Sequence, residues 1–184
     1  MKTHILPLLP VAALLIAFTA CTKEDQDRLN LEAELNMQYS DIQFAIDSGI
    51  PAGPTSVALT FNPAELNDVL AHNGYTIGQL KEFRITGAHV QNADAVAPSV
   101  YDAVQRLAIE LGRNGSGYQM IAKVDPVPHG ATELTLETSG IDLAQAMKAD
   151  SVHLRASLVL GEAITHASNH LLKLNGKLVV TTAH

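Results

Sequence analysis

Cysteine is almost absent from this sequence, since Cys21 is the only one in 184 residues. The chain therefore contains no internal disulfide, and its folded part must draw its stability from a packed core. A thiol nucleophile in the body of the protein is excluded as well, because the single cysteine lies close to the N-terminus. The question that the scarcity raises is what Cys21 does.

Tryptophan is absent too, and the other aromatic residues are few, at four Phe and four Tyr. Sugar-binding modules usually stack their ligands on exposed aromatic rings, so this composition disfavours a glycan-binding role. Basic residues number 12 against 19 acidic ones and form no cluster. A surface of net negative charge repels phosphate backbones, which argues against a nucleic-acid partner.

Catalytic signatures are also missing. The sequence contains no G-x-S-x-G elbow, no glycine-rich phosphate loop of either common type, and no calcium-loop pattern. Nothing in the pattern therefore predicts an enzyme. A hydrolase whose site is assembled from residues distant in the sequence is the third hypothesis that we carry, and it has no motif in its support.

What the sequence does contain begins at its N-terminus. Lys2 is followed by an apolar run from Ile5 to Ala20, "ILPLLPVAALLIAFTA", which is 16 residues long and interrupted by two prolines. A membrane-spanning helix needs about 20 apolar residues. The shorter run behind a basic residue is typical of a secretory signal peptide, which we place at residues 1–20.

The residues around Cys21 resemble the lipobox of bacterial lipoproteins, in "FTAC", with Phe18 where the pattern prefers leucine. The resemblance implies that Cys21 is acylated and becomes the new N-terminus. Lys23, Glu24 and Asp25 then resemble the lipoprotein export signal of Bacteroidota. That second resemblance implies an outer-membrane lipoprotein exposed at the cell surface, with the periplasmic face as the alternative. Several acyl chains would anchor the protein stably.

Removal of residues 1–20 takes away one basic residue and leaves 11 against 19 acidic residues, a net charge of −8. We divide the mature chain into an acylated cysteine with an acidic tether, residues 21–28, and one domain, residues 29–184.

Two short helices are expected in this domain, one from "NPAELNDVLAHNG", capped by Asn62, and one from "SGIDLAQAMKAD". Thr76 is expected to cap a further turn. We also expect Arg84 and Arg155 to pair with Glu82 and Asp150 nearby.

Elsewhere in the domain, apolar residues alternate with polar ones, the period of half-buried strands. Nine or ten strands predict an all-β fold, mainly an antiparallel β-sandwich, with a barrel as the alternative. Asn175-Gly176 between two apolar runs is a strong hairpin signal, so we predict a turn there.

With the strands laid out, most of residues 55–183 resembles a loose group of uncharacterised β-sandwich lipoproteins of Bacteroidota. The resemblance lies in "LKEFRITGAHV", "VQRLAIELGRNGSGYQMIAKV", "LTLETSGIDLAQAMKADSVHLRASLVL" and "LKLNGKLVVTTA". It implies a fold and a cellular address, and no activity.

Histidine is the one polar residue in surplus. His166 and His170 in "HASNH" have the i, i+4 spacing that lets two imidazoles on one helical turn share a metal ion. His153, Asn169 and His184 are possible third ligands. The general base of a metalloprotease is missing, because Ala167 stands where that motif has glutamate. Zinc or copper binding is therefore an alternative function. The simpler interpretation is that these are ordinary histidines of loops and strand faces that bind no metal.

The leading hypothesis is a non-catalytic lipoprotein without a cofactor. It is held at the membrane by Cys21 and used for binding or assembly with other envelope or surface proteins.

Overall fold

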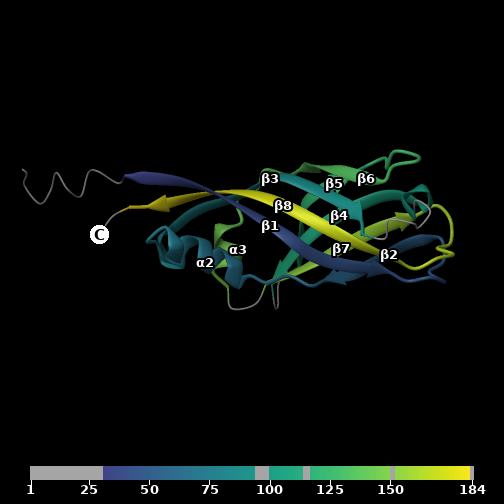
Figure 1. Cartoon of the computed structure of the whole chain (residues 1–184), viewed down its shortest axis with the longest axis horizontal. Coiled ribbons are helices and arrows are strands. Elements are labelled where there is room, and N and C mark those ends of the chain that lie inside the picture. Colours follow the sequence, from purple (N-terminus) through teal and green to yellow (C-terminus); the bar gives the residue numbers. More distant parts are fainter. Residues whose placement is uncertain (1–30, 94–99, 114–116, 150–151, 183–184) are drawn as a thin grey trace, which may run out of the picture.

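The computed structural model describes residues 31–93, 100–113, 117–149 and 152–182. These residues form an elongated, almost entirely antiparallel β domain (Figure 1). The all-β prediction is confirmed. The structure describes eight strands, fewer than the alternation suggested: β1 (Glu32–Ile46), β2 (Gly53–Leu59), β3 (Leu80–Asn92), β4 (Val104–Arg113), β5 (Tyr118–Val124), β6 (Glu133–Thr138), β7 (Val152–Leu160) and β8 (Ser168–Thr181).

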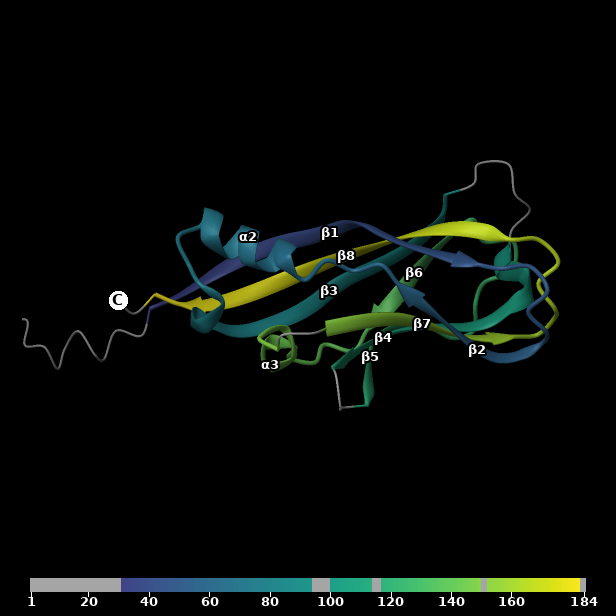
Figure 2. The same ribbon diagram turned by 90° about the horizontal axis from the view of Figure 1, so that it is seen from below.

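The strands belong to one sheet in the order β1-β8-β3-β6-β5-β4-β7-β2. The sheet is curled, so that its two halves face each other across the core (Figure 2). β6 joins the halves because it pairs with β3 at one end and with β5 at the other. At the opposite side, a single bridge between Gln43 and Thr60 brings the two outermost strands together. The architecture therefore lies between a sandwich and a closed barrel.

The core consists of the inward side of each strand. β8 shows the rule most clearly, because its buried and half-buried residues alternate over most of the 14 residues from Ser168 to Thr181. Since successive side chains of a strand point to opposite faces, this alternation places one apolar row inside the curled sheet. β8 also pairs along its length with β1 on one side and β3 on the other.

The predicted hairpin at Asn175-Gly176 is wrong, because β8 runs straight through both residues. Gly176 faces the core, and a Cβ atom built on it would lie 2.4 Å from Cε2 of Phe83. Glycine is present here because the Phe83 ring packs directly over the backbone, one of the established reasons for glycine inside a strand. The turn signal and this packing signal look the same in the sequence.

β1 contains two runs of alternating residues, one on each side of Ser40 and Asp41. It is one strand of 15 residues, with a register shift between Tyr39 and Ile42 where it pairs with β8. The irregularity breaks the alternation at Ser40 and Asp41, which are both exposed. A bulge of this kind interrupts the pattern without ending the strand.

The two short helices are confirmed as α2 (Ala64–His72) and α3 (Ala144–Met147). α2 begins after Pro63, and its first amide donates a hydrogen bond to Oδ1 of Asn62 at 3.1 Å. The 3₁₀ turns are η1 (Ile77–Gln79), which opens with a reciprocal capping box between Thr76 and Gln79, and η2 (Val100–Ala103). Both helices lie in connections between strands of opposite halves of the sheet.

The two ends of the described domain lie side by side. Thr182 donates hydrogen bonds to the carbonyl of Leu31 from its amide at 2.8 Å and from its hydroxyl at 2.6 Å. β1 begins and β8 ends at this extremity of the long axis (Figure 1). The described domain therefore begins and ends at the same extremity, and the connections after β1 and β7 lie at the other (Figure 2).

Candidate functional site

A hollow of about 430 Å³ opens on the surface near the end of the domain remote from Leu31. Its lining carries no charged side chain and contains three alanines, together with amide and hydroxyl groups. The residues come from β1, from β2 and the residue after it, from the residue that follows β3, and from β8: Gln43, Phe44, Ala45, Ala58, Thr60, Ala93, Asn169, His170 and Leu171.

The register of β1 and β2 explains why the sheet is open here. The amide of Thr60 donates to the carbonyl of Gln43 at 3.2 Å. If the two strands continued in this register, Ala45 would pair with Ala58. Instead both alanines are exposed and line the hollow. β1 and the residue after β2 therefore meet at one bridge, and beyond it the two edges of the curled sheet lie apart.

The segment that links β1 to β2 makes its hydrogen bonds elsewhere. Gly49 donates from its amide to the carbonyl of Ile164 at 2.8 Å, and the amide of Ile164 donates to the carbonyl of Ile50 at 2.9 Å. Gly49 has a φ of +83°, a conformation that glycine adopts without strain. The link between β1 and β2 is therefore bonded to the β7–β8 connection.

Behind the hollow, His170 lies in a buried chain of polar groups. Its Nδ1 is 2.9 Å from the Tyr101 hydroxyl and its Nε2 is 2.8 Å from Oγ of Ser168. The imidazole stacks on Phe44 with a centroid distance of 5.0 Å and an interplanar angle of 26°. Tyr101, Ser168 and His170 are each no more than 3% exposed. Both ring nitrogens therefore have protein partners, as a buried histidine requires.

Burial raises the pKa of Tyr101 above its ordinary value, and the negative charge of Glu133 adds to the effect. The tyrosine therefore stays protonated and can donate to, or accept from, the imidazole. A serine beside an imidazole is the contact that nucleophilic catalysis uses. Here both hydroxyls are buried, and the chain of groups links β8 to η2 beneath the hollow.

The residues that the sequence singled out for a metal do not form a helical turn. His166 is exposed in the β7–β8 connection, where its Nδ1 lies 2.9 Å from the Thr165 hydroxyl, and His170 is inside β8. Across the described segments, no group of three or more His, Cys, Asp or Glu side chains is placed to hold a metal ion. His184, one of the possible third ligands, lies outside the described residues, as do Cys21, Lys23, Glu24 and Asp25.

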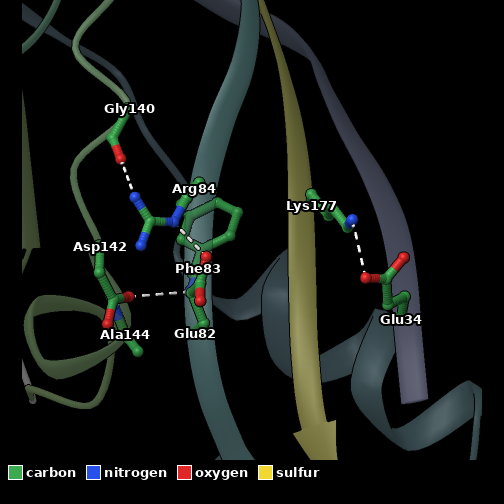
Figure 3. Close-up of polar contacts among 8 residues, drawn as sticks. All are labelled: Glu34, Glu82, Phe83, Arg84, Gly140, Asp142, Ala144 and Lys177. Atoms are coloured by element: carbon green, nitrogen blue, oxygen red, sulfur yellow. Dashed lines mark hydrogen bonds and ion pairs between the residues drawn. The ribbon is translucent and has the colours of Figure 1, made fainter. Parts of the chain in front are cut away.

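The arginines behave partly as the sequence predicts. Arg84 pairs with Glu82, as expected, and also donates to the carbonyl of Gly140 (Figure 3). Arg155 instead pairs with Glu110, at 2.6 Å between Nε and Oε2. Its expected neighbour, Asp150, lies outside the described residues.

Asp142 attaches α3 to β3 near this cluster. Its Oδ1 accepts hydrogen bonds from the amides of Phe83 at 3.0 Å and Ala144 at 2.9 Å (Figure 3). The amide of Leu143 donates to the carbonyl of Phe83 at 2.7 Å. These three bonds hold the helix against the sheet. On the neighbouring strands, Lys177 pairs with Glu34 at 2.8 Å, across the outer surface.

In the described segments, no helix has the length and apolar character needed to cross a membrane. No family model matches the chain. No curated protein sequence matches it either.

Among solved structures, the chain is similar to one titled "Crystal structure of decameric BFDV Capsid Protein", with a TM-score of 0.36 and 16% sequence identity. The match covers 80% of this chain and 98% of that one. At this level of similarity the comparison carries no argument about function.

Sequence reasoning missed Tyr101 and Ser168 as partners of His170. One signal was present, because counting back by twos from the apolar Leu172 places His170 and Ser168 on the inward face of the same strand. Tyr101 had no such signal, since it lies far away in the sequence. The hollow at Gln43 and Thr60 was equally hidden, because it depends on how far the sheet curls.

Proposed function

We propose that this protein is a lipid-anchored envelope lipoprotein, exposed at the cell surface, and that its β domain is a non-catalytic binding or assembly module. The observation that carries the proposal is the sequence around Cys21. A basic residue and a 16-residue apolar run precede a lone cysteine, and Lys23, Glu24 and Asp25 follow it. The resemblance to a lipobox with a Bacteroidota export signal supplies both the anchor and the address.

Two features of the fold support this proposal. The tether joins the domain at Leu31, beside Thr182, at one end of the long axis. The hollow at Ala45 and Ala58 lies more than ten residues further along β1, which at about 3.3 Å per residue is roughly 40 Å from the tether. A module anchored at one end and open at the other presents its hollow away from the membrane.

The lining favours an uncharged partner that forms hydrogen bonds, such as an extended stretch of polypeptide. Amide and hydroxyl side chains at Gln43 and Thr60 supply donors and acceptors, and the three alanines leave room beside them. Carbohydrate is the less suitable class of partner, because sugars usually stack on exposed rings. The two rings that line the hollow, Phe44 and His170, are both buried.

The anchor is tested by growing cells with a labelled fatty acid and purifying the protein. We expect label in the wild type and none in the Cys21→Ser variant, with the wild type in the membrane fraction and the variant released from it. Lys23→Ala serves as the matched control, because it changes the neighbouring charge and leaves the acylated atom in place. Unlabelled wild-type protein would refute the anchor.

A further inference from the structure

The strands of the sheet differ in how their free edges are protected. β1, at one end of the strand order, carries Glu32 and Glu34, which pair with Lys81 and Lys177 across its face. β2, at the other end, carries Pro54. Charged residues and proline are the usual devices that stop an edge strand from pairing with another chain. Both terminal strands of the sheet therefore carry such a device.

A third free edge lies within the sheet, at the start of β5. There β5 pairs with β4, from Gly112 opposite Tyr118 onward. On its other side, within the described segments, β6 pairs only with Ala122 and Lys123. Tyr118, Gln119 and Met120 therefore project beyond β6 with one side unpaired. We refer to these three residues as the β5 edge.

The β5 edge has none of the protection seen on β1 and β2. All three of its residues are exposed and none is charged. Tyr118 and Met120 are 45% and 40% exposed, and they are two of the three large apolar side chains found exposed in the described segments. Unpaired main-chain groups beside exposed apolar side chains form a template for another strand.

The outer surface behind this edge is formed by the Tyr118 ring and an ion pair. The Tyr118 ring lies over Gly112, where a Cβ atom would approach its Cε1 to 2.8 Å. The guanidinium carbon of Arg155 stacks 3.7 Å from the centre of the same ring, and Arg155 is itself neutralised by Glu110. Tyrosine, methionine and arginine are enriched where proteins meet.

We propose that the β5 edge is a self-association surface, at which β5 of a second copy of this chain pairs antiparallel to the first about a two-fold axis through Gln119. In that arrangement Tyr118 of each copy stands opposite Met120 of the other, so the two exposed apolar residues of one edge meet those of its partner. Two chains of net charge −8 repel each other over most of their surfaces, and the uncharged β5 edge lets them approach at low electrostatic cost. The surface is the same on both partners, as a two-fold dimer requires.

The test uses the mature chain, residues 21–184, carrying Cys21→Ser, so that its result depends neither on the lipid anchor nor on the apolar run of the signal peptide. In this background Gln119→Cys adds the only thiol, on the proposed axis, where opposed Cβ atoms lie close enough for a disulfide. We expect mild oxidation to yield a covalent dimer of twice the chain mass. Ser56→Cys, exposed on the edge of β2, is the matched control and should yield at least about tenfold less.

Sedimentation of the Cys21→Ser chain without a second cysteine gives an independent measurement. We expect a monomer–dimer equilibrium with a Kd below about 100 μM. Met120→Lys should weaken the dimer at least about tenfold. Leu31→Lys, which places a charge at the third exposed apolar residue, should leave the Kd unchanged. Equal crosslinking at positions 119 and 56, or a chain that stays monomeric above that concentration, would overturn the proposal. Acylation of Cys21 is unaffected by either result.

Discussion

The edge of the Phe83 ring occupies the space in which a side chain at residue 176 would lie. Phe83 is 1% exposed, and its Cε2 is 2.4 Å from the position of a Cβ atom at Gly176. The two residues belong to neighbouring strands, β3 and β8, and the contact seats the ring in the centre of the curled sheet. This packing, rather than a turn, accounts for the glycine.

Gly176→Ala should therefore destabilise the protein by about 1–3 kcal/mol, because the buried ring must move in a core that is already filled. Chemical denaturation measures the change. Gly78→Ala is the control, since a Cβ there meets nothing closer than the Thr76 hydroxyl at 3.7 Å, and it should stay within about 1 kcal/mol of wild type. Phe83→Leu should recover part of the loss in the Gly176→Ala background. If residues 175–176 formed a turn instead, no such coupling to Phe83 would be seen.

Two buried tyrosines make a matched pair for testing the polar chain behind the hollow. The Tyr39 hydroxyl is buried and forms no hydrogen bond with the described residues, whereas the Tyr101 hydroxyl contacts His170. Tyr39→Phe should be neutral or stabilise by up to about 1 kcal/mol, and Tyr101→Phe should cost about 1–2 kcal/mol, because only the second removes a partner from a buried polar atom. Thermal and urea unfolding distinguish the two. Equal effects would contradict the assignment.

Alkaline pH should destabilise the domain through the same two residues. Burial raises the pKa of Tyr39 and of Tyr101, with further contributions from Glu65 and Glu133 respectively. Tyrosines in the unfolded chain ionise near pH 10, so above that pH the unfolded state loses protons that the folded state keeps. The stability is complete below about pH 10 and falls as pH rises, by up to about 1.4 kcal/mol per pH unit for each tyrosine. Urea midpoints from pH 9 to 11 measure this slope. It should be shallower in the Tyr39→Phe/Tyr101→Phe variant, and an unchanged slope would refute the prediction.

The carboxylate of Asp142 should be needed to seat α3 on β3. Asp142→Ala removes the acceptor of two main-chain amides, at Phe83 and Ala144, and should cost about 1–2 kcal/mol. Asp142→Asn keeps an acceptor oxygen and should lose less than half as much. Hydrogen exchange of these two amides reports the local effect. Protection that is unaltered in Asp142→Ala would show that the bonds contribute nothing.

The sequence predicted those parts of the fold that depend on local periodicity. Alternation identified most of the strand residues and their inward faces, and the cap at Thr76 and the Arg84–Glu82 pair follow from neighbouring residues. It failed where one signal has two physical causes, as at Gly176. It also failed for the hollow and the partners of His170, because these depend on how β1, β2 and η2 meet in space. No local pattern encodes the distance at which the curled sheet stops closing.

Exposure of intact cells to a protease tests the central claim, a lipoprotein anchored at Cys21 and displayed outside the cell. We expect the wild type to be degraded on intact cells, and a Lys23→Ala/Glu24→Ala/Asp25→Ala variant to stay membrane-bound and protected. A periplasmic marker protein must survive in both samples. Wild-type protein that is protected in intact cells and degraded only after the outer membrane is opened would contradict surface display.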